Sequence, residues 1–265
     1  MTTVHTLASG SSGNALLVCC GSTRVLVDAG ISCRRITAAL AHMGLRPDEL
    51  DALLITHTHS DHIAGLQTLL KRTEFPIYST AAAGRELAFR LAGIQPRLRA
   101  LTPCEPFSLG ALTVTAIPAS HDAPGSCGYR LDGADGGVGI LTDTGYVTDE
   151  AAALLPGVSL SVLEANHDVE TLCSGPYPYY LKERILGTQG HLCNEDAARF
   201  AVTLVQSGAS EVVLAHLSRE NNTPAMARTA VETALNAAGL TPILSVAPRD
   251  TLSEAHICRR TVCSE

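Results

Sequence analysis

The chain has 265 residues, of which 46% are hydrophobic and 17% charged, so it can bury a substantial core and is not a disordered or fibrous protein. Its formal net charge of -7 excludes the broad positive field of proteins that bind nucleic acid regardless of sequence. No apolar stretch approaches the roughly 20 residues of a membrane span, and the first residues do not resemble a secretory signal. We therefore expect a cytoplasmic protein without membrane contact, whose contacts with nucleic acid would be local.

The nine cysteines form no CxxC pair, so neither a zinc ribbon nor a disulfide framework is visible. We expect reduced and mostly buried thiols. The oligomeric state stays open, with a homodimer as one option.

Apolar periodicity and turn residues divide the chain into strands and helices. In the first half they predict strands at 4–8, 14–20, 24–28, 52–56, 77–79 and 98–101, and helices at 32–43, 61–72 and 81–92. In the second half they predict strands at 107–109, 112–118, 127–131, 138–141, 160–164, 211–215 and 243–246, helices beginning near 149 and 178, and helices at 194–206 and 224–238.

This mixture of hairpins and strand–helix units predicts an α/β fold of two mixed β-sheets packed face to face, with helices outside, because each sheet needs both faces covered. No charged or low-complexity linker divides the chain. We expect residues 1–252 to form one domain and residues 253–265 a loosely held C-terminal tail.

The strongest chemical signal is the run His57-Thr58-His59-Ser60-Asp61-His62, directly after a predicted strand. In extended backbone, residues two apart point to the same side, so His57 and His59 can bind one metal ion. Asp61 and His62 come where a helix begins and face a second position. The motif therefore predicts two metal ions held from one loop.

Four ligands cannot complete two sites, and the remaining candidates also follow predicted strands. These are His121, Asp143 and His216. Taken singly, each would more often be a structural residue, but loops at strand ends are where sheet folds place their sites. Asp143 can bridge two cations because a carboxylate has two oxygens.

Read together, these motifs resemble, in order, the metal motifs of the metallo-β-lactamase superfamily. The matching runs are residues 57–62, 120–122, 141–145 and 214–218. Asp28 resembles an aspartate of the superfamily that supports the metal loop and binds no metal. The resemblance implies a four-layer αββα sandwich with the metals at one edge.

Further runs resemble the branch of that superfamily called WalJ or YycJ. They are residues 7–14, 121–129, 164–167, 187–192 and 216–222, and the resemblance extends from about residue 4 to about residue 250. It implies a metal-dependent hydrolase with 5′-to-3′ exonuclease activity on DNA, acting on nucleic-acid ends or on a small phosphodiester.

The resemblance also implies an assignment of ligands. It places His57, His59 and His121 on one ion, Asp61, His62 and His216 on the other, and Asp143 between them. Two such cations lower the pKa of bound water and clamp the reacting oxygens of a phosphodiester, so the bridging hydroxide would be the nucleophile. Zinc, manganese and iron all suit this set of ligands, and the sequence does not choose among them.

We expect catalytic roles for one of the ligands, Asp61, and for His191 and Glu164. His191 resembles a histidine that phosphodiesterases of the superfamily direct at the substrate phosphate, and Glu164 a carboxylate that orients it. The alternative is a helix-capping histidine and a solvated strand-end acid. We expect His191, His167, Ser218 and Arg219 on the substrate side, although a structural role for His167 is equally compatible with the sequence.

Two segments have simpler explanations that we favour. The loop at 9–13 could cradle an anion, but a hairpin turn explains the same residues. Tyr177, Tyr179 and Tyr180, beside Lys182 and Arg184, could stack bases and hold phosphates. A helix that begins at a proline and packs its aromatic residues inward predicts the same sequence.

The leading hypothesis is thus a dinuclear hydrolase of phosphodiesters. The runner-up keeps the metals but opens a thioester or lactone, as glyoxalase-II-like relatives do, and a small-molecule cyclic phosphodiesterase is a further alternative. A non-catalytic metal-binding regulator is the third hypothesis, against which the intact ligand set argues.

Overall fold

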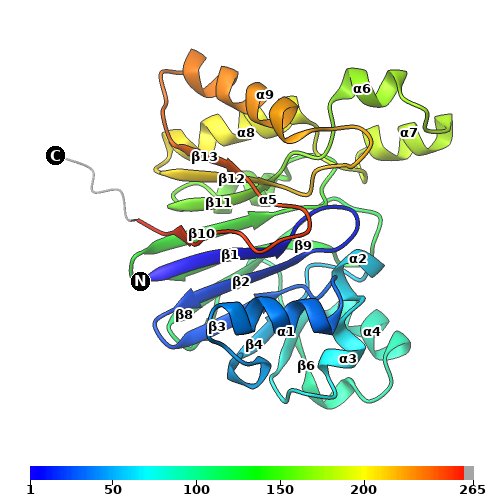
Figure 1. The fold of residues 1–265 in the computed structure, drawn as a ribbon, viewed down its shortest axis with the longest axis vertical. Coiled ribbons are helices and arrows are strands. Elements are labelled where there is room, and N and C mark those ends of the chain that lie inside the picture. Colours follow the sequence, from blue (N-terminus) through cyan, green and yellow to red (C-terminus); the bar gives the residue numbers. More distant parts are fainter. Residues whose placement is uncertain (260–265) are drawn as a thin grey trace.

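The structure is a computed structural model that describes residues 1–259, and it consists of two seven-stranded sheets flanked by helices (Figure 1). The first sheet contains, in spatial order, β14 (His256–Ile257), β1 (Thr2–Ala8), β2 (Ala15–Cys20), β3 (Thr23–Val27), β4 (Ala52–Leu54), β5 (Ile77–Thr80) and β6 (Leu98–Leu101). The second contains β13 (Ile243–Val246), β12 (Glu211–Ala215), β11 (Leu160–Glu164), β10 (Gly136–Leu141), β9 (Cys127–Gly133), β8 (Leu112–Pro118) and β7 (Phe107–Leu109).

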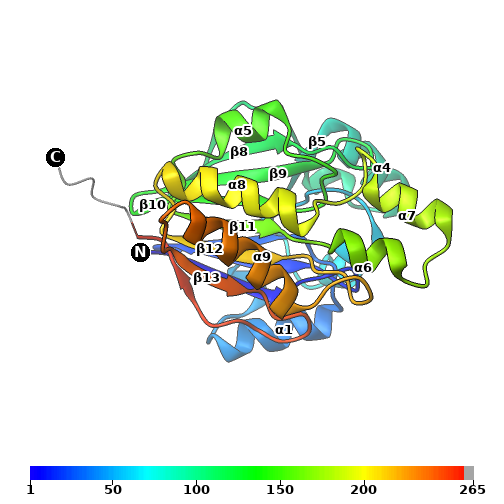
Figure 2. The same ribbon diagram turned by 90° about the horizontal axis from the view of Figure 1, so that it is seen from above.

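Most of the helices cover the outer faces of the two sheets, and some of them lie beyond the ends of the strands (Figures 1 and 2). The helices are α1 (Cys33–His42), α2 (Ser60–Ile63), α3 (Leu66–Leu69), α4 (Ala81–Arg90), α5 (Asp149–Leu154), α6 (Val169–Ser174), α7 (Tyr179–Leu186), α8 (Asn194–Gln206) and α9 (Pro224–Ala237). Within the described part of the chain, none of them combines the length and apolar character needed to cross a bilayer.

Three hydrophobic clusters hold these layers together. The central cluster lies between the sheets and takes buried residues from both, among them Val18 and Tyr129. An outer cluster packs α8 and α9 on the second sheet, and another packs α1 and α3 on the first. The expected sandwich of two mixed sheets between layers of helices is therefore confirmed.

The single helix predicted over 61–72 is wrong, because two short helices, α2 and α3, meet at Gly65 instead. The Gly65 N–H donates a hydrogen bond to the Ala29 carbonyl at 2.8 Å. A Cβ atom at Gly65 would lie 2.1 Å from the Ile31 carbonyl oxygen, so only glycine permits this approach. The break packs the metal loop directly against the segment that follows β3.

The expectation of a loosely held tail from Ser253 is also wrong for the residues that the structure describes. Residues 256–257 form β14, which pairs antiparallel with β1. The Cys258 N–H donates to the Thr2 carbonyl at 2.9 Å, and Cys258 is buried. The remainder of the expected tail, from residue 260, lies outside the described residues.

Candidate metal centre

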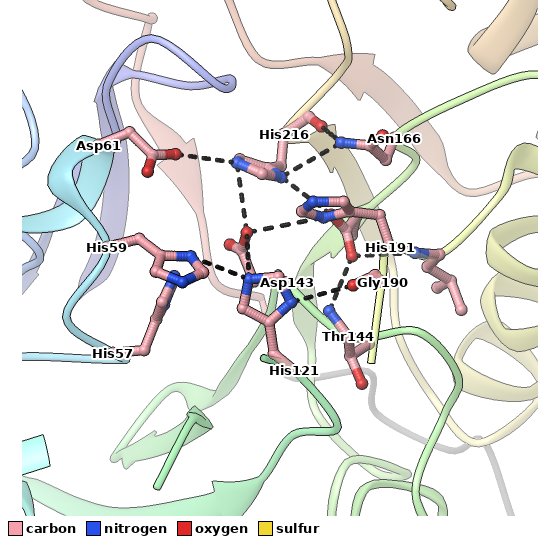
Figure 3. A network of polar contacts seen from close by, with 12 residues as sticks. His57, His59, Asp61, His121, Asp143, Thr144, Asn166, Gly190, His191 and His216 are labelled. Carbon is pink, nitrogen blue, oxygen red and sulfur yellow. Dashed lines mark hydrogen bonds and ion pairs between the residues drawn. The ribbon is translucent and has the colours of Figure 1, made fainter. Parts of the chain in front are cut away.

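The candidate residues meet where strands of both sheets end (Figure 3). They include Asp28 after β3, His57 after β4, Asp143 after β10, Glu164 at the end of β11 and His216 after β12. Asp28, Asp143 and His216 adopt left-handed backbone conformations, with φ of 60°, 57° and 56°. This conformation is costly for residues other than glycine and is concentrated at functional sites. The strained backbone conformations therefore occur where the chain leaves a strand and turns toward the candidate metal centre.

Two clusters of His and Asp side chains match the two ligand groups expected from the sequence. In the first, His57, His59 and His121 converge, and His121 Nε2 lies 3.2 Å from His59 Nδ1. In the second, Asp61 Oδ2 lies 3.5 Å from His62 Nε2 and 3.6 Å from His216 Nε2. In each cluster all potential ligand atoms lie within 4.8 Å of one another.

Asp143 lies between the two clusters. Its Oδ2 atom is 3.3 Å from His62 Nε2, and its Oδ1 atom is 3.5 Å from His216 Nε2 and 3.8 Å from His121 Nε2. The side chain therefore contacts residues of both groups, as a carboxylate that bridges two ions would.

The buried donor atoms fit divalent metal ions. Within the described residues, His57 Nε2, His216 Nε2 and Asp143 Oδ2 are buried and have no hydrogen-bond partner. Buried polar atoms nearly always have a partner, and a metal ion would supply it here. Imidazole and carboxylate donors suit zinc, manganese and iron. The clusters are thus consistent with a dinuclear metal site.

Hydrogen bonds outside the clusters orient the imidazole rings. His62 Nδ1 donates to Asp28 Oδ2 at 2.7 Å, His121 Nδ1 to the Gly190 carbonyl at 3.0 Å, and His216 Nδ1 to Glu164 Oε1 at 2.9 Å. Because each Nδ1 donates to an oxygen, each Nε2 faces the centre and is the atom that can bind a metal once its proton has left. Asp28 belongs to neither cluster, and its Oδ1 accepts a hydrogen bond from the Thr56 N–H at 2.9 Å, beside the loop that carries the histidines.

The first hairpin loop braces the second cluster. Gly13 N–H donates to the Gly10 carbonyl at 3.0 Å, so the loop at 9–13 is a turn, as favoured from the sequence. The Ser9 hydroxyl oxygen accepts a hydrogen bond from the His216 N–H at 2.8 Å. Asn14 Nδ2 donates to Asp61 Oδ2 at 3.3 Å. Sequence patterns did not single out this contact of Asn14.

Electrostatics concentrate negative charge at the centre. Burial would lower the pKa of His216, but Asp143, Asp61 and Glu164 together raise it to about 10. Burial likewise opposes ionisation of His62, yet Asp143 and Asp28 hold its pKa well above the usual value. The same contacts hold the pKa of Asp143 well below its usual range despite its burial. The buried carboxylates therefore stabilise positive charge on the imidazoles beside them.

Glu164 connects this centre to His191. One oxygen, Oε1, accepts hydrogen bonds from His191 Nδ1 at 2.8 Å and from His216 Nδ1. The other, Oε2, accepts from the backbone N–H of Thr144 at 3.0 Å and of Leu192 at 3.1 Å. Burial would raise the pKa of Glu164, but the charge and hydrogen bond of His191 and the hydrogen bond of His216 lower it to about 2.

A third group of side chains could also hold a metal, because one potential ligand atom from each lies within 4.8 Å of the others. Its members are Asp143, Glu164, His191 and His216. Both imidazole Nδ1 atoms already donate to Glu164, however, and all four hydrogen bonds of that carboxylate come from protein groups. We therefore interpret this group as a hydrogen-bond network and not as a third metal site.

A pocket of about 170 Å³ opens beside the centre. Its lining residues are Ser11, His121, Asn166, Tyr177, Leu181, Arg184, Ile185, Gln189, Gly190, His191 and Ser218. Two of the expected substrate-side residues, His191 and Ser218, are thus placed at the pocket. The other two are not: Arg219 contacts Asp250 at 3.9 Å on the surface, and His167 is 1% exposed and does not line the pocket.

The wall opposite the metal clusters is one face of α7, and here the expected inward packing of the tyrosines is wrong. The side chains of Tyr179 and Tyr180 are 75% and 72% exposed, and α7 contains no buried residue. Leu181 and Ile185, four residues apart on the same helical face, occupy the pocket side instead. Sequence periodicity could not show which face of this helix would meet the pocket.

The sandwich and its paired His and Asp clusters define a metal-dependent hydrolase of the metallo-β-lactamase superfamily. The chain belongs to this superfamily, because residues 23–217 match the model of the beta-lactamase superfamily domain. Exodeoxyribonuclease WalJ of Streptococcus pneumoniae serotype 2 is 38% identical over 221 residues, which cover 82% of this chain and 81% of that protein. Exodeoxyribonuclease YycJ of Bacillus anthracis is 35% identical over 234 residues, 88% of this chain and 89% of that protein.

A solved structure shows the same fold. The metallo-β-lactamase fold protein YhfI of Bacillus subtilis superposes with a TM-score of 0.72 at 19% sequence identity, over 96% of this chain and 100% of that one. At this identity the likeness supports the architecture alone.

Proposed function

We propose that the protein is a dinuclear metal-dependent phosphodiesterase that removes nucleotides from 5′ ends of DNA. The observation that carries this proposal is the contact of His191 with Glu164, which places an oriented imidazole at the pocket beside both His and Asp clusters. The two relatives described above are exodeoxyribonucleases, and they cover more than four-fifths of the chain.

The ligands are assigned as the clusters group them. His57, His59 and His121 would hold one ion and Asp61, His62 and His216 the second. Asp143, which contacts residues of both clusters, would be shared between the ions. Zinc or manganese, and also iron, would lower the pKa of bound water and clamp the attacking and leaving oxygens of a phosphodiester. Asp28 and Glu164 hold the rings in the tautomer that this binding requires.

His191 acts on the substrate in this proposal. Glu164 accepts the hydrogen bond from Nδ1, so Nε2 is left for a phosphate oxygen or for protonation of the leaving oxygen. Asp61 is the one carboxylate among the terminal ligands, so it can also accept a proton from the attacking water.

Two properties favour chain ends as substrates. The pocket of about 170 Å³ is smaller than the roughly 300–1,000 Å³ of pockets that enclose a whole small ligand, so it can admit only the end of a strand. The net charge of -7 predicts few phosphate contacts and a shallow dependence of affinity on salt, with a slope of about −1 to −3.

The decisive experiment tests the metal-loaded protein on one panel of substrates. The panel contains linear DNA with a 5′-phosphate, a covalently closed circle of the same sequence, RNA, a cyclic dinucleotide, a thioester and a lactone. We expect stepwise digestion of the linear DNA and an intact circle. Cleavage of the circle at the rate of the linear strand would refute end-directed action. Hydrolysis of only the thioester or lactone would support the glyoxalase-II-like alternative.

A further inference from the structure

The pocket-facing side of α7 carries one basic residue. Among the described residues that line the pocket, Arg184 is the only lysine or arginine. Lys182, also on α7, donates instead to the Cys173 and Gly175 carbonyls at the end of α6, both at 2.7 Å. Arg184 is therefore the one side chain of this wall that can offer a fixed positive charge to a ligand in the pocket.

The carboxyl end of α7 is tied to two of the loops that carry cluster residues, those of His121 and Asp143. Ser120 Oγ donates to the Thr188 carbonyl at 2.7 Å, and the His191 N–H donates to the Ile185 carbonyl at 3.0 Å. A Cβ atom at Gly145, two residues after Asp143, would lie 2.3 Å from the Thr188 oxygen. The turn after α7 thus packs closely on the Asp143 loop and fixes the position of Arg184 relative to the centre.

Asp122 links Arg184 to the first cluster of candidate metal ligands, which contains His59 and His121. Arg184 Nε donates to Asp122 Oδ2 at 2.6 Å, and Asp122 Oδ1 lies 3.5 Å from both His59 Nε2 and His121 Nε2. A single carboxylate therefore separates the guanidinium from these rings. The two Nη groups of Arg184 donate to no described residue. Their N–H groups are therefore available to bind two oxygens of a phosphate.

We propose that Arg184 binds the terminal 5′-phosphate of a DNA strand while the next phosphodiester lies at the metal centre. This inference rests on the proposed exonuclease function. The guanidinium stands beside the metal clusters with Asp122 between them, so a phosphate held there is the neighbour of the one being cleaved. Tyr177, which lines the same pocket, offers a ring on which the base of that terminal nucleotide can stack. Asp122 is a positioning residue for Arg184.

The test compares kcat/KM on one linear DNA carrying either a 5′-phosphate or a 5′-hydroxyl. We expect wild-type protein to prefer the phosphate by roughly 10- to 100-fold, the size of a charge-assisted hydrogen bond. In R184Q the loss should fall mainly on the phosphorylated substrate, chiefly through KM, so that the ratio approaches one. R184K should keep part of the preference, because lysine retains the charge without the fork.

The matched control is R199Q on α8, which removes the same charge from a residue that is 72% exposed, pairs with Asp196 and does not line the pocket. R199Q should retain the wild-type ratio. Equal loss on both substrates in R184Q, or no preference in the wild type, would overturn the inference. Should R184Q fail to fold, D122N must lower the same ratio. If the metal-loaded wild type digests no linear DNA with either end, the proposed function fails instead.

Discussion

The two walls of the pocket differ in how they are held. On the metal side, His121 and His191 line the pocket. Behind them, His57, His62 and Asp143 are at most 2% exposed, and hydrogen bonds to Asp28 and Glu164 orient His62 and His216. On the opposite side, α7 buries no residue and is tied to the rest of the protein mainly near its ends. We infer that the first wall sets the chemistry and the second sets which end of a substrate is accepted. Changes in the first wall should affect metal content, whereas changes in the second should leave it intact.

The largest effect is expected from Asp143→Asn, which weakens the residue that contacts both clusters. An amide offers one oxygen and no charge, so both ions should be held poorly and turnover should fall below detection. Elemental analysis after reconstitution should give about two ions for wild-type protein and less than about one for the variant. Loss of a single terminal ligand, as in His59→Ala, should cost less metal. Two tightly held ions in the Asp143 variant would show that it does not bridge.

The next largest effect is expected from His191→Ala, which removes the imidazole that Glu164 holds at the pocket. We expect turnover on phosphodiesters to fall by roughly 10²–10⁴, the range for loss of a general acid or base, with metal content near wild type. Glu164→Gln is the matched variant: it also disturbs His216, so metal affinity should fall by roughly 10–100-fold as well. If His191→Ala loses its metals, the network around Glu164 is a metal site after all.

A smaller effect is expected on the pH dependence of metal binding. The pKa of His216 is raised to about 10 and that of His62 lies well above its usual value, so both rings are protonated at neutral pH before a metal binds. A metal must displace those protons, and zinc uptake should release about two protons per chain near pH 7. Calorimetry in buffers of different ionisation enthalpy measures this number. Affinity should keep rising with pH well above the ordinary histidine pKa, and a plateau near pH 7 would contradict the raised values.

The same contrast between the walls explains what the sequence predicted well. The run from His57 to His62 is contiguous, and strand and helix periodicity alone place its residues at one strand end. Asp143 and His216 were predictable for the same reason, since each follows an apolar strand. The agreement of Asp28 with a supporting role came from the family resemblance, because nothing in its local pattern distinguishes a ligand from a residue beneath one.

The predictions that proved wrong concern features that depend on contacts between residues distant in sequence. The break at Gly65 exists because its backbone approaches Ala29 and Ile31, which are distant in sequence. The short strand β14 depends on an unpaired edge of β1, which a short polar segment does not reveal. The orientation of α7 depends on where the pocket lies, and a helix with apolar residues on several sides is compatible with either face turned inward.

The smallest effect tests that orientation directly. Because Tyr179 and Tyr180 are 75% and 72% exposed, the double variant Tyr179→Ser/Tyr180→Ser should change the free energy of unfolding by no more than about 0.5 kcal/mol per site, as is usual for surface substitutions. Leu181→Ala is the contrast, because Leu181 lines the pocket beside Arg184 and is half-buried. It should alter KM for linear DNA, whereas the tyrosine variant should not. Thermal unfolding and steady-state kinetics on the three proteins measure both quantities. A large loss of stability in the tyrosine variant would mean that these rings pack inward, and α7 would then present a different face to the pocket.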